Sequence, residues 1–205
     1  MNERMANGAA LPKNWSGSTD RTGILQTGSD QTAFESVSKS RQLMLLCALG
    51  IAGVVLHTAF HWPLKLPGHH GLEWMAILVF ARCVSPLKWS ASITAGSAAI
   101  VSTLPVWGFS EPLVPLFYLL PGVVLDIGYR FFPAARVSVL WLGVIAALAH
   151  ASKPLSRYLI TALSDLHFGS LASGLAFPLS THLMFGLVGG LAGAVAWKLM
   201  QKKRG

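Results

Sequence analysis

The sequence predicts an all-α polytopic membrane protein, a bundle of about six transmembrane helices. Its 205 residues are 53% hydrophobic and only 12% charged, with a mean hydropathy of +0.54. A soluble globular domain carries about 25% charged residues, so this chain has too few to cover a water-exposed surface. From residue 43 onward, apolar runs alternate with short breaks at Pro, Gly or charged residues. These observations exclude a soluble enzyme.

The net charge of the chain does not indicate a nucleic-acid partner. The formal charge is +8, but the basic residues lie between apolar runs and form no basic face. A protein that follows a phosphate backbone needs such a face or stripe. We therefore expect a lipid bilayer, and no nucleic acid, among the partners.

The first element, residues 1–41, is predicted to be a disordered polar cytoplasmic tail. It is rich in Gly, Ser, Thr, Asn and Gln, and its composition offers little apolar surface for a core. No apolar segment follows Arg4 or Lys13, so no signal peptide is predicted. Cys47 and Cys83 lie in apolar segments, which favours reduced, packed thiols over a disulfide.

The second element, residues 42–200, is predicted to be the transmembrane domain. A hydrocarbon core of about 30 Å requires about 20 helical residues, and shorter helices are tolerated when their ends reach the interface. The fifth span is expected to end before Lys153 and Pro154, and residues 155–177 are placed outside the bilayer core, as an interfacial segment or part-helix. Residues 201–205 form a basic cytoplasmic C-terminus. The predicted spans are 42–61, 71–86, 89–108, 112–130, 136–152 and 178–200.

The distribution of basic residues predicts that both termini are cytoplasmic. With six spans, ten Lys and Arg residues lie in inner connections and three in outer ones, as the positive-inside rule requires. Trp62 and Trp107 fall at the outer interface, and Trp89 and Trp197 at the inner one. The expected location is the inner (plasma) membrane of the cell. The inner set is Lys39, Arg41, Arg82, Lys88, Arg130, Arg136, Lys198, Lys202, Lys203 and Arg204, and the outer set is Lys65, Lys153 and Arg157.

Small residues and prolines indicate how the predicted spans pack against one another. Small residues four positions apart let two membrane helices approach closely, and contact within the bundle is the favoured interpretation here. Prolines between residues 105 and 121 predict kinked or broken helices, which in membranes often line a cavity. The small-residue pairs are Gly186 with Gly190, Gly189 with Gly193, and Ala48 with Ala52.

The histidines all fall on the outer side of the six-span arrangement. His57 and His61 lie one helical turn apart, and His69 and His70 open the second span with Glu73 close by. Imidazole is the commonest transition-metal ligand, so His57, His61, His69 and His70 are the candidate metal ligands. The alternative is that histidine is simply tolerated in outer loops that exclude Lys and Arg. The full set is His57, His61, His69, His70, His150, His167 and His182.

The remaining acidic residues and the missing motifs argue against an enzyme. Asp126 precedes Arg130 by one turn, which predicts an i, i+4 ion pair or an inner docking contact. Glu111 and Asp165 are expected to be solvated. The sequence contains no serine-hydrolase elbow, zinc-protease helix or phosphate loop. Any ATP hydrolysis must therefore come from another subunit.

Three stretches carry a resemblance to a known family. They are WPLKLPGHHG at 62–71, PGVVLD at 121–126 and HLMFGLVGG at 182–190. With six short helices, a capping first loop and a Gly-rich last helix, they resemble the substrate-binding S components of energy-coupling-factor (ECF) transporters. The long polar tail departs from that pattern.

The resemblance implies a binding subunit of an ABC importer for a vitamin or a transition-metal ion. Separate cytoplasmic ATPases and a transmembrane coupling subunit would be its partners, and Ala48 and Ala52 would contact the coupling subunit. A ring-bearing vitamin would stack on Trp62, Trp74 or Trp107, whereas a transition-metal ion would be held as the ligand itself. The substrate-binding residues would be His57, His61, Trp62, His69, His70, Glu73 and His182.

Two further hypotheses stay open at this point. One is a membrane-embedded enzyme, or a haem- or metal-binding redox anchor, that uses the outer histidines. The other is a membrane organiser that recruits soluble partners through its tail.

Overall fold

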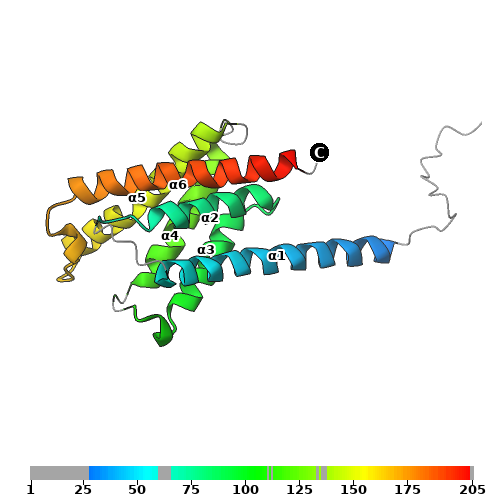
Figure 1. The fold of residues 1–205 in the computed structure, drawn as a ribbon. Coiled ribbons are helices and arrows are strands. Elements are labelled where there is room, and N and C mark those ends of the chain that lie inside the picture. The colour runs from blue at the N-terminus through cyan, green and yellow to red at the C-terminus, as the bar shows by residue number, and fades with distance from the viewer. Residues whose placement is uncertain are drawn as a thin grey trace, which may run out of the picture. The chain divides into compact units, whose positions relative to one another are not determined.

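The computed structural model describes residues 28–59, 66–109, 111, 113–132, 134 and 138–203, and these contain helices and no strand (Figure 1). The predicted all-α class is confirmed. Two short 3-10 helices, η1 (Pro105–Trp107) and η3 (Gly169–Leu171), accompany the α-helices. The α-helices are α1 (Gly28–Ala59), α2 (Gly71–Val84), α3 (Ser90–Ser102), α4 (Val114–Phe131), α5 (Val139–Leu163) and α6 (Ala176–Lys202).

Four of these helices are long and apolar enough to cross a membrane: the part of α1 from Ser38 to Ala59, α4, α5 and α6. Their outward faces carry exposed large apolar side chains, which suit lipid. α2 and α3 have 14 and 13 residues. At 1.5 Å per residue they measure about 20 Å, less than the hydrocarbon thickness. The described chain is thus a membrane bundle with two helices shorter than the sequence predicted.

The first helix begins earlier than expected. The chain divides after Lys39 into two compact units, and of the first unit the structure describes residues 28–39, which are helical. Residues 28–41, which we expected in a disordered tail, therefore belong to α1. In the second unit α1 buries Leu46 and Val54, and Ser97 of α3 donates a hydrogen bond to the Cys47 carbonyl at 3.3 Å.

The fifth helix does not end at residue 152, so that prediction is wrong. α5 continues to Leu163 with Pro154 inside it. Proline has no N–H, so the His150 carbonyl cannot receive its usual bond from residue 154. Pro154 is buried, and a proline is tolerated in a membrane helix whose neighbours pack around the break. The consequence is that Lys153 and Arg157, expected beyond the span, lie on the helix itself.

α6 lies alongside α5 and α2 (Figure 1). Gly186 and Gly190 face α5, and Gly189 and Gly193 face α2. A Cβ at Gly190 would overlap the Ala146 side chain, and one at Gly193 would overlap the backbone of α2. The two predicted small-residue pairs are confirmed as contacts within the bundle, and each pair serves a different neighbour.

Asp126 and Arg82 form a buried ion pair between α4 and α2, which we call the Asp126–Arg82 cluster. Arg82 Nη1 lies 3.1 Å from Asp126 Oδ1 and donates to the Lys88 carbonyl at 2.8 Å. The carboxylate also accepts the backbone N–H groups of Ala91 and Ser92 and the Ser92 hydroxyl. These N–H groups are the unpaired donors at the start of α3. The structure thus pairs Asp126 with Arg82, 44 positions away, where the sequence predicted an i, i+4 pair with Arg130 or an inner docking contact.

Candidate functional site

A cavity of about 310 Å³ lies among α1, the turn before α2, α4, α5 and α6. Its size is typical of a small-molecule site. Gly68, in the turn before α2, has a φ of +83°, a conformation that disfavours other residues, and Gly71 begins α2. A side chain at Gly71 would overlap the His150 ring, so both glycines keep the turn close to α5 and α6. The polar side chains that line the cavity are His57, His70, Glu111, Tyr118, His150, Lys153, Arg157 and His182.

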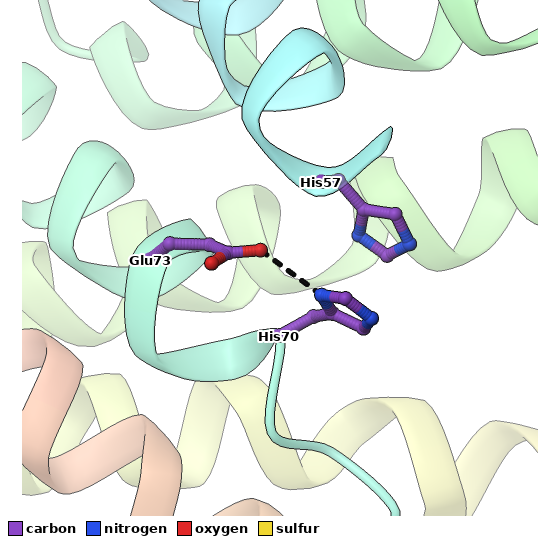
Figure 2. A group of neighbouring side chains, drawn as sticks. All are labelled: His57, His70 and Glu73. Atoms are coloured by element: carbon purple, nitrogen blue, oxygen red, sulfur yellow. Dashed lines mark hydrogen bonds and ion pairs between the residues drawn. The ribbon is translucent and has the colours of Figure 1, made fainter. Parts of the chain in front are cut away.

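His57 and His70 line the cavity and Glu73 lies beside them, and the side chains of these three residues point toward one another (Figure 2). His57 comes from the end of α1, His70 from the turn before α2, and Glu73 from the first turn of α2. The His57 and His70 rings stack with centroids 3.9 Å apart, and His70 Nδ1 donates to Glu73 Oε1 at 3.0 Å. His69 packs on His70, also at 3.9 Å.

A second histidine pair, His150 and His182, joins α5 to α6. Their rings stack with centroids 4.7 Å apart. His182 Nδ1 donates to the Pro178 carbonyl at 2.7 Å, and His150 Nε2 donates to the Gly68 carbonyl at 3.2 Å. His150 Nδ1 is buried and, in the described part of the chain, has no hydrogen-bond partner. The sequence placed His150 among the outer histidines but not among the substrate-binding residues, and the structure brings it into the cavity lining.

Two basic residues of α5 complete the lining. Arg157 Nη2 lies 2.5 Å from Glu111 Oε2, and its guanidinium lies over the Phe117 ring at 4.6 Å. The Lys153 ammonium lies 5.7 Å from the centroid of the Tyr118 ring. Glu111 is therefore paired and not simply solvated as predicted. Sequence reasoning missed Lys153 and Arg157 as site residues because it ended the helix before them.

Hydrogen-bond partners indicate which ring nitrogens remain available. The acceptors beside Nδ1 of His69, His70 and His182 are the Leu66 carbonyl, the Glu73 carboxylate and the Pro178 carbonyl. Such acceptors hold the proton on Nδ1 and leave a lone pair on Nε2. The site can therefore accept hydrogen bonds from a ligand, or bind a metal ion through these nitrogens.

A metal ion has candidate ligands in His57, His70 and Glu73. Each offers one ligand atom, and these atoms lie within 4.8 Å of one another. Imidazole and carboxylate are suitable ligands for zinc and similar ions. The two rings are stacked with an interplanar angle of 26°, so their lone pairs point in nearly parallel planes. Shared coordination of one ion would require one ring to rotate.

Other predicted site residues lie elsewhere. His61 and Trp62 are outside the described residues. Ala48 and Ala52 are exposed on α1, and Trp74 is buried in the core, where its ring meets Tyr118 edge-on at 5.1 Å. No family model, no curated protein and no solved structure matches this chain. The resemblance to S components accordingly stays a prediction.

Proposed function

We propose that this chain is the substrate-binding membrane subunit of an ECF-type importer for a micronutrient, a vitamin or a transition-metal ion. The inner (plasma) membrane would be its location, and separate subunits would hydrolyse ATP. The observation that carries the proposal is the cavity, because it gathers four histidines and two basic side chains within an apolar helix bundle. Ionisable residues inside a membrane are costly, and they commonly mark substrate pathways.

The chemistry of the cavity supports binding more than catalysis. Its polar groups are hydrogen-bonded so that ring nitrogens of His70 and His182 stay open toward a ligand. The rings of Phe109, Phe117 and Tyr118 supply apolar surface beside them. A few placed polar groups on an aromatic wall are typical of small-molecule sites.

The exposed small residues of α1 support a membrane partner. Ala48 and Ala52 lie on a face that also exposes Met44, Ile51 and Val55. Small residues at this spacing let a partner helix approach closely. A transmembrane coupling subunit fits this face, with the apolar neighbours covering the contact.

The test is native mass spectrometry and elemental analysis of the full chain purified in mild detergent. We expect a stoichiometric small molecule or metal ion, lost in the double variant His70→Ala, His182→Ala. His167→Ala is the matched control, because His167 is exposed and does not line the cavity. Absence of any ligand, together with unchanged uptake by the double variant, would contradict the proposal. A visible haem absorption band would instead favour the redox-anchor alternative.

The partner face has its own test. The double variant Ala48→Leu, Ala52→Leu should lose copurification with the coupling subunit and ATPases while the cavity still binds its ligand. Leucine keeps the face apolar but blocks close approach of a helix. Copurification that survives both substitutions would place the coupling contact on another face.

A further inference from the structure

Lys153 is a basic residue whose ammonium forms no ion pair with the described carboxylates. It lies on α5, within a segment apolar enough to cross a membrane, and it lines the cavity. In the described part of the chain its ammonium forms no ion pair: the carboxylates of Asp126 and Glu111 pair with Arg82 and Arg157, and that of Glu73 accepts a hydrogen bond from neutral His70. An unpaired charge in an apolar surrounding is expensive, so its presence calls for a ligand that pairs with it.

The charges that line the cavity also indicate a negatively charged ligand. Its lining contains Lys153, Arg157 and one carboxylate, Glu111. With the histidines neutral, these groups leave an excess of one positive charge. Arg157 is held between Glu111 and the Phe117 ring, so its charge is already compensated. Glu73 keeps its negative charge when His70 is neutral, but it does not line the cavity and accepts the hydrogen bond of His70. Among the lining groups, the excess positive charge therefore resides on Lys153.

The rest of the cavity complements a flat molecule with hydrogen-bond donors. The open nitrogens of His70 and His182 accept hydrogen bonds, and the Tyr118 hydroxyl is buried without a partner in the described residues. Phe109 and Tyr118 present ring faces and edges, with centroids 6.0 Å apart. Aromatic surface of this kind packs on planar rings.

We propose that the cavity binds a small organic anion, a ring compound whose carboxylate or phosphate group pairs with Lys153. The inference rests on the proposed function and narrows its micronutrient to an anionic one. A divalent metal ion fits less well, because the Lys153 ammonium shares the same cavity and repels a cation. Removing the Lys153 charge should therefore weaken the binding of an organic anion and strengthen the binding of a metal cation.

The first experiment compares three probes on the full chain in mild detergent, by tryptophan fluorescence or calorimetry. The probes are benzoate, phenyl phosphate and benzamide, the neutral analogue of benzoate. We expect the better anion to bind about ten- to a hundredfold more tightly than benzamide, as one charge-assisted hydrogen bond contributes. The tighter of the two anions distinguishes a carboxylate site from a phosphate site.

The second experiment changes Lys153. Lys153→Met keeps the length of the side chain and should bind the anion no better than benzamide, whereas Lys153→Arg should keep the preference. Lys198→Met is the matched control, because Lys198 is exposed near the end of α6 and does not line the cavity. The melting temperature of each variant checks that it is folded.

Three results would overturn the inference. They are equal or absent binding of anions and benzamide by the wild-type chain, a preference that survives in Lys153→Met, and cobalt(II) binding that Lys153→Met strengthens while no anion binds. The proposed function is tested separately. If the chain copurifies with a coupling subunit and with a neutral or metal ligand, the proposal of an importer subunit stands and only the anionic substrate is rejected.

Discussion

The Asp126–Arg82 cluster and the cavity both place ionisable side chains among apolar helices, yet they differ in how their charges are paired. The Asp126 carboxylate accepts hydrogen bonds from Arg82, from two backbone N–H groups and from the Ser92 hydroxyl. In the cavity, Lys153 forms no ion pair among the described residues, and His150 Nδ1 and the Tyr118 hydroxyl have no partner there.

This difference separates a structural site from a binding site. A buried charge that is paired and hydrogen-bonded joins helices, because removing one partner leaves the other exposed to a low dielectric. A charge that faces a cavity without a partner does not join helices and disfavours the ligand-free fold, but it is available to a ligand.

The largest effect is expected at Asp126. Asp126→Ala leaves Arg82 buried without its counter-ion and the start of α3 without its acceptor. Breaking a buried pair in this way lowers the free energy of unfolding by about 3–5 kcal/mol. Denaturation of the purified chain in detergent measures it, and Asp165→Ala, at an exposed position, is the control. A loss within about 0.5 kcal/mol would mean that the cluster does not hold α2, α3 and α4 together.

A smaller effect is expected on the glycine face of α6 toward α5. Gly190→Ala would press on Ala146, and Gly186→Ala would press on His150, whose Cβ lies 2.8 Å from the new atom. Overpacking of this kind costs about 1–3 kcal/mol. Both variants should melt earlier, but only Gly186→Ala should also weaken ligand binding. Gly96→Ala is the control, because the nearest neighbour of its new Cβ would lie 4.0 Å away. Equal losses of ligand binding in both α6 variants would show that Gly186 has no special connection to the cavity.

The smallest effect, and one of opposite sign, is expected at Lys153. Lys153→Met removes an uncompensated charge from the bundle, so the ligand-free chain should become more stable by about 0.5–2 kcal/mol, as is common when a functional group is replaced. Thermal melting without ligand measures this change. Arg82→Met provides the contrast, because it leaves Asp126 unpaired and should destabilise. A Lys153 variant that melts as early as Arg82→Met would reveal a structural role for the lysine.

Some features of the site were predictable from local sequence. The spacing of Gly186, Gly189, Gly190 and Gly193 predicted close packing of the last helix, and the structure confirms it. The sequence also placed His57 and His61 near the end of the first span and His69, His70 and Glu73 at the start of the second; of these, the structure brings His57, His70 and Glu73 together. These predictions worked because helical spacing and a short connection fix which residues share a face.

Other features depended on contacts between distant segments. Whether α5 stops at Pro154 is decided by the helices packed around it, since a proline can end a helix or be accommodated within it. That outcome moved Lys153 and Arg157 from a loop into the cavity lining. Likewise, Asp126 had a local candidate partner one turn away, but the bundle supplied Arg82 from another helix.

The sequence by itself determined the membrane class and the all-helical fold, because composition and apolar run length set the free energy of transfer into lipid segment by segment. Only the tertiary structure decided which charges are paired and which face an open cavity. Pairing depends on distances between side chains far apart in the chain, and Coulomb energy in a low dielectric makes those distances decisive.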